Sequence, residues 1–258
     1  MRWVVPKPDA IEGPRRDIMP VMNERGLLIT GAGGFLGAEV ARHWASLGNT
    51  VVLVDSARGR ARVEQLAAEI GPRASTVIGD ITDAESWRNI LNQATGALSG
   101  PPAAAALVAG AWQGGDSFHE SGDAVWEAMI DANLETVRRA FAALLPPMVA
   151  RGSGSIVVVG ARPGVRPWTG AGSAAYTAAK AGVLALTQAV AAEVLERGVR
   201  INAVLPSTMD TPANRKAMPD VDPTKWVSLS SVAGVIGFLL SDAAKDVSGA
   251  LVPVYGRS

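Results

Sequence analysis

Short, continuous apolar runs alternate along most of this chain with longer segments whose apolar residues recur at helical spacing. Runs rich in valine, isoleucine, leucine and alanine are typical of strands covered on both faces, and the longer segments indicate amphipathic helices. The pattern predicts strands over residues 26–29, 50–54, 74–78, 103–109, 156–159, 199–204 and 250–254, and helices over residues 38–47, 59–70, 84–97, 123–149, 173–195 and 232–240. This alternation predicts an α/β fold: a single open, doubly wound parallel sheet with helices on both faces and a ligand site at the carboxyl ends of the strands.

The length and composition favour one domain over residues 26–258. The chain has 258 residues, of which 48% are hydrophobic and 19% are charged, and this is enough apolar material for a substantial core. No internal repeat or interdomain linker divides this part of the sequence. Residues 1–25 contain prolines and basic residues but lack the unbroken apolar stretch of a signal peptide or membrane span, so we expect a peripheral arm.

Charge and the scarcity of metal-binding side chains argue against several classes of function. The formal net charge is zero and no block of like charges is present, so nothing indicates a nucleic-acid or membrane partner. The absence of cysteine excludes disulfides and thiolate metal sites, and two histidines are too few for a histidine-rich metal centre. We therefore expect no metal, a small-molecule substrate and a cytoplasmic location.

A glycine-rich turn follows the first predicted strand. It reads Thr-Gly-Ala-Gly-Gly-Phe-Leu-Gly over residues 30–37 and leads into a helical segment. Glycines let a pyrophosphate approach the backbone closely, and a helix N-terminus offers N–H groups and the positive end of its dipole. Asp55 ends the next strand, about 20 residues further on, where the ribose hydroxyls of an adenine dinucleotide lie in such units. The combination predicts a Rossmann-type dinucleotide site; the alternative is a tight turn with Asp55 as a helix N-cap.

Tyr176 and Lys180 lie one helical turn apart in the predicted helix 173–195, so their side chains share a face. A phenol with an ordinary pKa near 10 needs nearby positive charge to exchange a proton at neutral pH. Lys180 and an oxidised nicotinamide would both supply that charge. The alternative is an ordinary pair on a helix surface, but this chain has only two tyrosines and the pair follows a dinucleotide fingerprint. We therefore predict that the pair carries the chemistry.

With these motifs the chain resembles the short-chain dehydrogenase/reductase family from Leu27 to Val254. The resemblance implies direct hydride transfer between nicotinamide and substrate, with Tyr176 as proton donor or acceptor and Lys180 binding the nicotinamide ribose and lowering the tyrosine pKa. It also implies that Asn133 holds a proton-relay water, although a helix-surface amide is the alternative. The cofactor contacts that it implies are Gly31, Gly33, Gly34, Phe35, Leu36, Gly37, Asp55, Asp80, Ile81, Ala109, Gly110, Tyr176, Lys180, Pro206 and Thr211.

Three positions depart from the pattern of many family members. Phe35 replaces a glycine of the turn, and residues 107–110 read Leu-Val-Ala-Gly, without the asparagine that braces the central strand. Most importantly, Ala161 follows the strand 156–159 where the family has a serine whose hydroxyl polarises the substrate carbonyl. Losing one such donor costs roughly 10²–10³ in turnover for carbonyl chemistry. Thr169 and Ser173, in the following loop, are the candidates to replace it.

The dihydropteridine reductase branch of the family keeps the tyrosine and the lysine and lacks the serine. Residues 108–115 and 204–219 are similar to segments of that branch. Its substrate, a quinonoid dihydropterin, has a conjugated imine that accepts hydride readily, so tyrosine can protonate a ring nitrogen and the serine is less needed. Asn133 instead favours an ordinary ketone reductase. Trp112 and Trp168 follow the fourth and fifth strands, where they either stack on a flat heterocycle, pack in the core or anchor a loop.

Asp55 favours NAD(H), because a carboxylate accepts hydrogen bonds from both ribose hydroxyls and repels a 2′-phosphate; Arg58 and Arg60 leave NADP(H) possible. Two other functions stay open: a conventional alcohol/ketone or 3-oxoacyl reductase with a substitute for the serine, and a non-catalytic NAD(H)-binding sensor. The two long alanine-rich helices, 123–149 and 173–195, favour a homodimer or homotetramer, as in the family.

Overall fold

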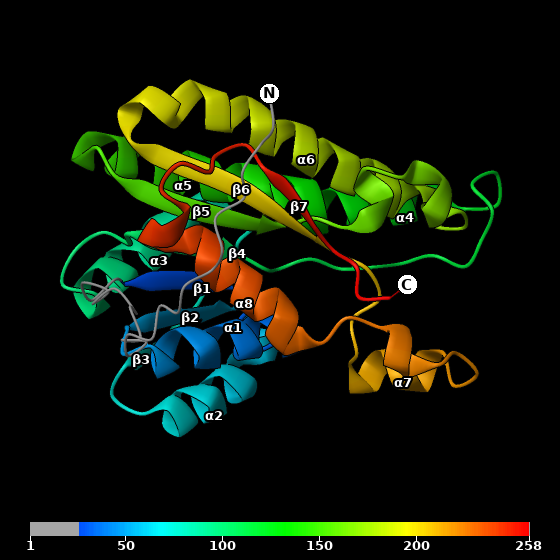
Figure 1. Ribbon diagram of the computed structural model, residues 1–258, viewed down its shortest axis with the longest axis horizontal. Helices are drawn as coiled ribbons and strands as arrows, with labels where there is room; N and C mark the ends of the chain where they lie inside the picture. The colour runs from blue at the N-terminus through cyan, green and yellow to red at the C-terminus, as the bar shows by residue number, and fades with distance from the viewer. Residues whose placement is uncertain (1–25, 258) are drawn as a thin grey trace, which may run out of the picture.

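The strands form one parallel sheet, as the alternating pattern predicts (Figure 1). The computed structural model describes residues 26–257, so the predicted arm, residues 1–25, lies outside the described residues. The seven strands of these residues follow the order β3-β2-β1-β4-β5-β6-β7, and all neighbouring pairs are parallel. Their bounds are β1 Leu27–Thr30, β2 Val51–Asp55, β3 Ala74–Ile78, β4 Ala104–Leu107, β5 Gly154–Val159, β6 Val199–Pro206 and β7 Leu251–Val254. The strand order reverses between β1 and β4, and this switch point opens a crevice at their carboxyl ends.

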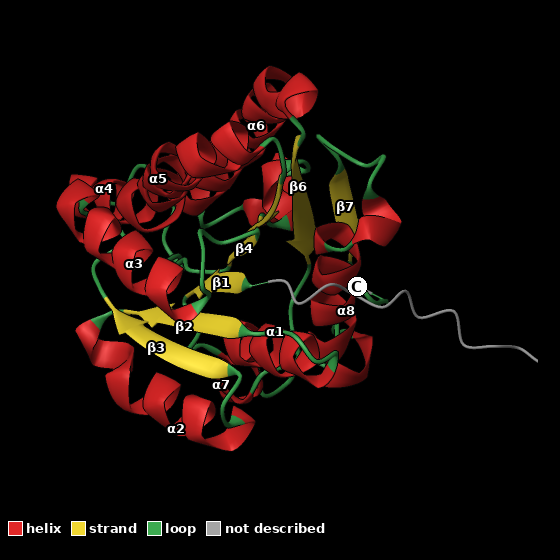
Figure 2. Ribbon diagram, turned by 90° about the vertical axis from the view of Figure 1, so that its left-hand side faces the viewer, coloured by secondary structure: helices red, strands yellow, loops and turns green. Residues whose placement is uncertain are grey.

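Helices cover both faces of the sheet (Figure 2). They are α1 Phe35–Ser46, α2 Arg60–Ile70, α3 Ala84–Ala97, α4 Asp123–Met129, α5 Thr136–Arg151, α6 Ala174–Val194, α7 Pro212–Ala217 and α8 Leu229–Leu240. Helices α3, α5 and α6 pack on one face, and α1, α2 and α8 pack on the other. In β1, Leu28 joins the first core, whereas Leu27 and Ile29 join the second, and all three are fully buried. The continuous apolar runs therefore reflect a sheet that is buried on both faces.

The helix predicted over residues 123–149 is interrupted in the structure. Helices α4 and α5 are separated by a π-helical segment, Ile130–Glu135, which widens the helix locally. Within this segment Asn133 is fully buried, and its amide Nδ2 donates to the Met129 carbonyl at 2.9 Å. Apolar periodicity does not reveal the wide turn, because buried residues recur at helical spacing through the whole segment.

Two further boundaries differ from the sequence prediction. Helix α1 begins at Phe35 rather than at Ala38, so the glycine turn leads straight into the helix. The stretch after Pro206, for which no helix is predicted, contains α7. Thr211 caps this helix, because its Oγ1 accepts a hydrogen bond from the Asn214 N–H at 3.1 Å.

Within residues 26–257, one helical stretch, Ala174–Arg197, is long and apolar enough to cross a membrane by length and composition. This stretch includes α6, and its buried residues, Val183 and Leu184 among them, belong to the core beside the sheet. Packing within the fold accounts for part of its apolar character, because 39% of this apolar window is buried.

Candidate active site

The glycine turn joins three segments at the carboxyl end of β1. Gly31 has φ = +66°, a left-handed conformation that favours glycine. A Cβ at Gly31 would lie 2.8 Å from the Ala109 Cα, so the turn after β1 packs directly on the loop after β4. Gly34 is the N-cap of α1, and no side chain caps this helix within the described residues. The backbone therefore presents N–H groups and the positive end of the helix dipole at this turn.

A cavity of about 710 Å³ lies at this turn. It gathers most of the cofactor contacts that the resemblance implies: Gly31, Gly34, Phe35, Leu36, Gly37, Asp55, Asp80, Ile81, Ala109, Gly110 and Thr211. Gly33, Tyr176, Lys180 and Pro206 are not among its lining residues; Gly33 is bonded to Asp55, Pro206 ends β6, and Tyr176 and Lys180 lie in α6. Most of the expected cofactor contacts, from distant parts of the sequence, therefore meet at one edge of the sheet.

The Asp55 carboxylate is oriented by backbone groups. Its Oδ2 accepts a hydrogen bond from the Gly33 N–H at 2.8 Å, and its Oδ1 accepts one from the Ser56 N–H at 2.8 Å. The Oδ1 also accepts a longer bond from the Ser56 hydroxyl at 3.4 Å, whereas the Oδ2 can accept a second hydrogen bond, so the group keeps acceptor capacity toward the cavity that it lines. This geometry fits a carboxylate that binds neighbouring hydroxyls.

Sequence reasoning named Arg60 near this carboxylate and missed Arg62. Arg60 forms an ion pair with Glu64 at 3.5 Å and does not line the cavity. Arg58 and Arg62 both line it, and the Arg62 Nε donates to the Gly33 carbonyl at 2.9 Å. The spacing could have indicated Arg62. Arg58 and Arg62 are four positions apart and would share a face of a helix, whereas Arg58 and Arg60 are two apart and would not.

Asp80 also lines the cavity, just after Gly79, whose N–H donates to the Asp55 carbonyl at 3.0 Å, and its carboxyl is held in its charged form. Its Oδ1 accepts hydrogen bonds from the Thr82 Oγ1 at 2.6 Å and from the Thr82 N–H at 2.8 Å. These two bonds, the hydroxyl contact first, lower the pKa of the Asp80 carboxyl. The carboxylate is therefore available as an acceptor at neutral pH.

Lys180 is buried deep in α6 beside the end of β5. Its side chain is 4% exposed, and its Nζ donates to the Val159 carbonyl at 2.8 Å. Burial lowers the pKa of the ammonium from 10.5 to about 8. The Nζ lies 5.8 Å from the centre of the Tyr176 ring, so the structure places the two side chains of the predicted pair together.

Tyr176 has a raised pKa rather than a lowered one. Burial raises the pKa of the phenol to about 12, because the phenolate is poorly solvated in this environment. The resemblance implies that Lys180 lowers the pKa of Tyr176, so the effect of the lysine opposes the effect of burial. Tyr176 is therefore protonated at neutral pH. A positive charge close to the ring would favour its phenolate form.

Asn133 and Gly110 connect the wide helical turn to the loop after β4. The Asn133 Nδ2 donates to the Ala111 carbonyl at 3.0 Å, and its Oδ1 accepts a hydrogen bond from the Ala111 N–H at 3.3 Å. A Cβ at Gly110 would lie 2.7 Å from the Asn133 Oδ1 and 3.5 Å from the Lys180 Nζ. The asparagine is therefore a brace for this loop beside the lysine, rather than an amide on the helix surface.

No hydroxyl stands at position 161. Ala161 is 5% exposed at the end of β5, where it precedes a 3-10 turn. The two candidate replacements are engaged in their own loop: the Thr169 Oγ1 donates to the Arg166 carbonyl at 2.8 Å, and the Ser173 Oγ donates to the Gly170 carbonyl at 3.0 Å. In this conformation neither hydroxyl substitutes for the missing donor.

Two tryptophans lie in the loops that follow β4 and β5. Trp112 is 64% exposed and Trp168 is 74% exposed, so neither is a core residue. The loops that carry them are joined, because the Gly115 N–H donates to the Gly172 carbonyl at 2.8 Å. Of the alternatives drawn from the sequence, packing in the core is therefore wrong for both tryptophans.

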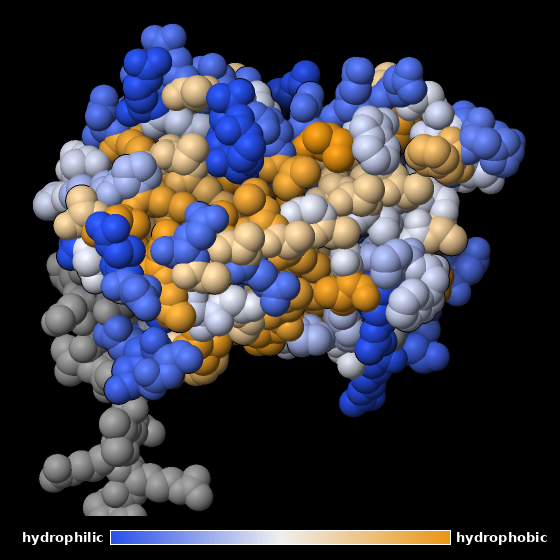
Figure 3. All heavy atoms as spheres, turned by 90° about the horizontal axis from the view of Figure 1, so that it is seen from above, coloured by the Kyte–Doolittle hydropathy of each residue, from blue (hydrophilic) through white to orange (hydrophobic). Residues whose placement is uncertain are grey.

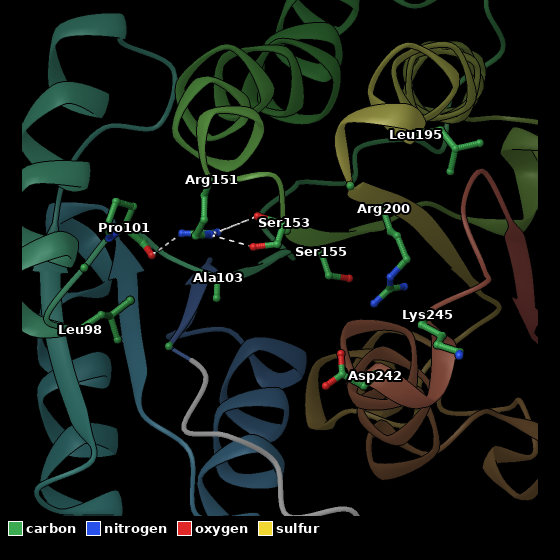
Figure 4. Close-up of a pocket in the computed structure, with 14 residues that line it drawn as sticks. Leu98, Pro101, Ala103, Arg151, Ser153, Ser155, Leu195, Arg200, Asp242 and Lys245 are labelled. Carbon is green, nitrogen blue, oxygen red and sulfur yellow. Dashed lines mark hydrogen bonds between the residues drawn. The ribbon is translucent and has the colours of Figure 1, made fainter.

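A second cavity, of about 600 Å³, lies at the opposite edge of the sheet, near the amino ends of the strands (Figure 4). Arg151 donates to the carbonyls of Pro101 and Pro102, each at 3.0 Å. Arg200 donates to the Leu239 carbonyl at 2.8 Å, near the end of α8. These guanidinium groups join loops and a helix end, so this cavity belongs to the framework of the fold.

Comparison with known proteins agrees with this geometry. The model of the family described as "short chain dehydrogenase" matches residues 25–222. The 2,5-dichloro-2,5-cyclohexadiene-1,4-diol dehydrogenase LinX of Sphingobium indicum is 33% identical over 240 residues, which cover 89% of this chain and 94% of that protein. The cis-4-hydroxycyclohexanecarboxylate dehydrogenase of Sinomonas cyclohexanicum is 35% identical over 241 residues, which cover 90% of this chain and 96% of that protein.

Solved structures share the fold over nearly the same length. A short chain dehydrogenase/reductase family oxidoreductase from Burkholderia thailandensis has a TM-score of 0.80 and 32% identity, covering 91% of this chain and 92% of that one. Levodione reductase has a TM-score of 0.83 and 27% identity, covering 91% of this chain and 97% of that one. The chain therefore belongs to the short-chain dehydrogenase/reductase family and is an oxidoreductase.

Proposed function

We propose that this protein is an NAD(H)-preferring reductase that acts on a conjugated ring, with a quinonoid dihydropterin as the candidate substrate. The observation that carries the proposal is the methyl group of Ala161 at the end of β5. A ketone needs a donor at this place to stabilise the developing oxyanion. A conjugated imine has no such oxygen at the reacting bond, so it tolerates alanine there.

The residues around the large cavity fit a nicotinamide adenine dinucleotide. A Cβ at Gly37 would overlap the Gly31 carbonyl oxygen, so the turn admits a close backbone approach only with glycine. The uncapped N-terminus of α1 suits a pyrophosphate, and Asp55 suits the adenosine ribose. When bound, such a cofactor supplies the hydride.

On the protein side, we assign the proton to Tyr176. With a pKa of about 12 the phenol is protonated at neutral pH, which suits a donor to a substrate nitrogen. Lys180 lies beside the ring and stabilises the phenolate left behind. One C=N bond of the substrate is reduced when its carbon accepts a hydride and its nitrogen accepts the phenol proton. Solvent then returns a proton to Tyr176.

A dehydrogenase or reductase of cyclic alcohols and ketones is the second candidate. The two relatives named above are dehydrogenases of a cyclohexadiene diol and of a hydroxycyclohexane carboxylate. For this chemistry Thr169 or Ser173 would have to leave its carbonyl partner and turn toward the substrate. The alanine therefore counts against this candidate, and the names of the relatives count in its favour.

NADH oxidation by the purified protein separates the candidates. The assay compares a quinonoid dihydropterin with a panel of cyclic ketones and uses Tyr176→Phe as the control. Pterin turnover that is lost in the variant supports the proposal. Turnover of ketones alone would favour the second candidate, and tight NADH binding without turnover of either would indicate a cofactor-binding sensor.

We also propose that the chain forms a homodimer or homotetramer through α5 and α6. A shallow hollow of about 400 Å³ on these helices is lined by apolar residues, Phe141, Leu145, Leu186 and Val190 among them. Hydrophobic residues gather on the face seen from above in Figure 3, the side on which α6 lies in Figure 1. Leu186→Glu should lower the mass measured by light scattering after gel filtration; an unchanged mass would place the interface elsewhere.

A further inference from the structure

Two arginines in the loop after β5 stack on one tyrosine near the C-terminus. The guanidinium carbon of Arg162 lies 5.8 Å from the centre of the Tyr255 ring, and that of Arg166 lies 5.5 Å from it. The Arg166 N–H donates to the Arg162 carbonyl at 3.0 Å, so the two residues lie one turn apart. An aromatic ring attracts cations to its face, so a single ring holds both side chains.

Tyr255 is fixed to the end of β6. Its carbonyl accepts a hydrogen bond from the Ser207 Oγ at 2.7 Å, and the Ser207 N–H donates to the Val254 carbonyl at 3.2 Å. Arg162 and Tyr255 are half-buried, whereas Arg166 is exposed. The ring is therefore a fixed support, and it orders both guanidinium groups before a ligand binds.

The turn that carries the arginines packs on the helix of the proposed catalytic pair. Gly164 lies between the two arginines, and a Cβ there would lie 3.1 Å from the Lys180 carbonyl oxygen in α6. Arg162 directly follows Ala161, the position of the missing hydroxyl. The turn therefore begins beside the position at which the resemblance places the substrate, and it rests on the helix that presents Tyr176.

Neither guanidinium group has an anionic partner in the part of the chain that the structure describes. Both lack a hydrogen bond and an ion pair within residues 26–257. Residues 136–192, which include β5, this turn and most of α6, contain no aspartate or glutamate, and neither do residues 247–258. Two neighbouring guanidinium groups repel one another, and an anion bound between them would relieve this repulsion.

Among the described residues, no acid of the adjoining loops is paired with either arginine. These acids are Asp116, Glu120 and Asp123 near the start of α4 and Asp210, Asp220 and Asp222 between β6 and α8. Asp210 instead pairs with the Arg215 Nε at 2.6 Å, and the Asp222 Oδ1 accepts a hydrogen bond from the Thr224 N–H at 2.9 Å. Arg257 adds a further positive charge two residues after Tyr255.

We infer that Arg162 and Arg166 bind a carboxylate carried by the substrate, so that the enzyme prefers rings with an acidic substituent. A carboxylate accepts two parallel hydrogen bonds from a guanidinium group, which gives such a contact both strength and direction. The inference rests on the proposed function, because it needs the reacting ring beside Tyr176. The two arginines are then specificity-determining residues that orient the ring from its acidic end.

Pairs of probes that differ by one carboxylate test this assignment. Calorimetric titration of the NADH-bound protein compares pterin-6-carboxylate with 6-methylpterin, and NADH oxidation compares 4-oxocyclohexanecarboxylate with 4-methylcyclohexanone. We expect the wild-type protein to favour the acidic member of a pair. Arg162→Gln and Arg166→Gln should each reduce this preference by about tenfold, as for a lost charge-assisted hydrogen bond. The matched control is Arg197→Gln, an exposed arginine beyond the far end of α6, which should leave the preference unchanged.

Variants of the ring separate ligand binding from a structural clamp. Tyr255→Phe keeps the ring and should keep the preference, whereas Tyr255→Leu releases both arginines and should lower it. An equal loss of affinity for both members of a pair in Arg162→Gln, together with a lower melting temperature, would show that the arginines only fix the end of the chain. That result would overturn the inference.

The remaining outcomes are distinct. A wild-type protein without preference for the acidic probes would overturn the inference. So would a preference that appears only after Gly-Ser-Gly is added behind residue 258, because the terminal carboxylate would then be the natural occupant. If the pterins neither bind nor turn over but the acidic ketone is preferred and this preference needs both arginines, the pterin assignment fails and the inference stands. If no probe binds or turns over, both fail.

Discussion

Replacing Lys180 by methionine tests how strongly burial opposes the charge of the lysine. The side chain is 4% exposed, and its pKa is lowered from 10.5 to about 8. A lowering of this size corresponds to about 3 kcal/mol at 1.36 kcal/mol per pH unit. Methionine removes this penalty but leaves the Val159 carbonyl without the ammonium that donates to it at 2.8 Å. An unpaired buried carbonyl costs about 1–3 kcal/mol, so the net change near pH 7 is small.

The pH dependence gives the sharper result. Between pH 8 and 10.5 the unfolded chain holds the Lys180 proton and the folded chain has released it, so the free energy of unfolding rises with pH. The methionine variant lacks this rise. From pH 7 to 9.5 we expect the wild-type protein to gain about 2 kcal/mol relative to Lys180→Met, while the variant loses turnover.

Urea unfolding at pH 7, 8.5 and 9.5 measures this difference. Staying below pH 10 avoids the opposite effect of Tyr176, whose pKa of about 12 in the fold causes stability to fall above the ordinary tyrosine pKa of 10.0. Lys216→Met, at an exposed position of α7, is the control and should show no such pH dependence relative to wild type. A difference between wild type and Lys180→Met that stays flat from pH 7 to 9.5 would refute the argument from burial.

Three other substitutions test the site. Asp55→Asn removes a charged acceptor, so in a fluorescence titration NADH should bind about tenfold more weakly and NADPH more tightly; an unchanged preference would contradict the role of Asp55. Ala161→Ser restores a hydroxyl at the end of β5 and should raise the turnover of cyclic ketones by up to roughly 10², without a similar gain for the pterin; no gain would show that this position does not face the substrate. Gly31→Ala would force a Cβ to 2.8 Å from the Ala109 Cα at φ = +66°, so urea unfolding should show a loss of about 1–3 kcal/mol; full stability would mean that the turn relaxes at no cost.

The sequence pattern determined the fold because its signals are local and repeated. Apolar runs and helical spacing depend on neighbouring residues, and they predicted the parallel sheet, its strand positions and most helices. The glycine turn, Asp55, Tyr176 and Lys180 were also readable, since each motif joins chemistry-bearing residues at a spacing that the local backbone geometry explains. The short-chain dehydrogenase/reductase family follows from these motifs and is confirmed by the comparisons.

Tertiary structure decided what each site residue contacts. The π-helical segment that accompanies the burial of Asn133 leaves no mark in the apolar spacing, and the bond from Arg62 to Gly33 joins residues from two different elements. The lowered pKa of Lys180 and the raised pKa of Tyr176 arise from burial, which depends on how helices and loops from the whole chain pack around them. Periodicity determines which elements form, whereas contacts between distant elements determine the hydrogen-bond partners and the solvation of the side chains that carry the chemistry.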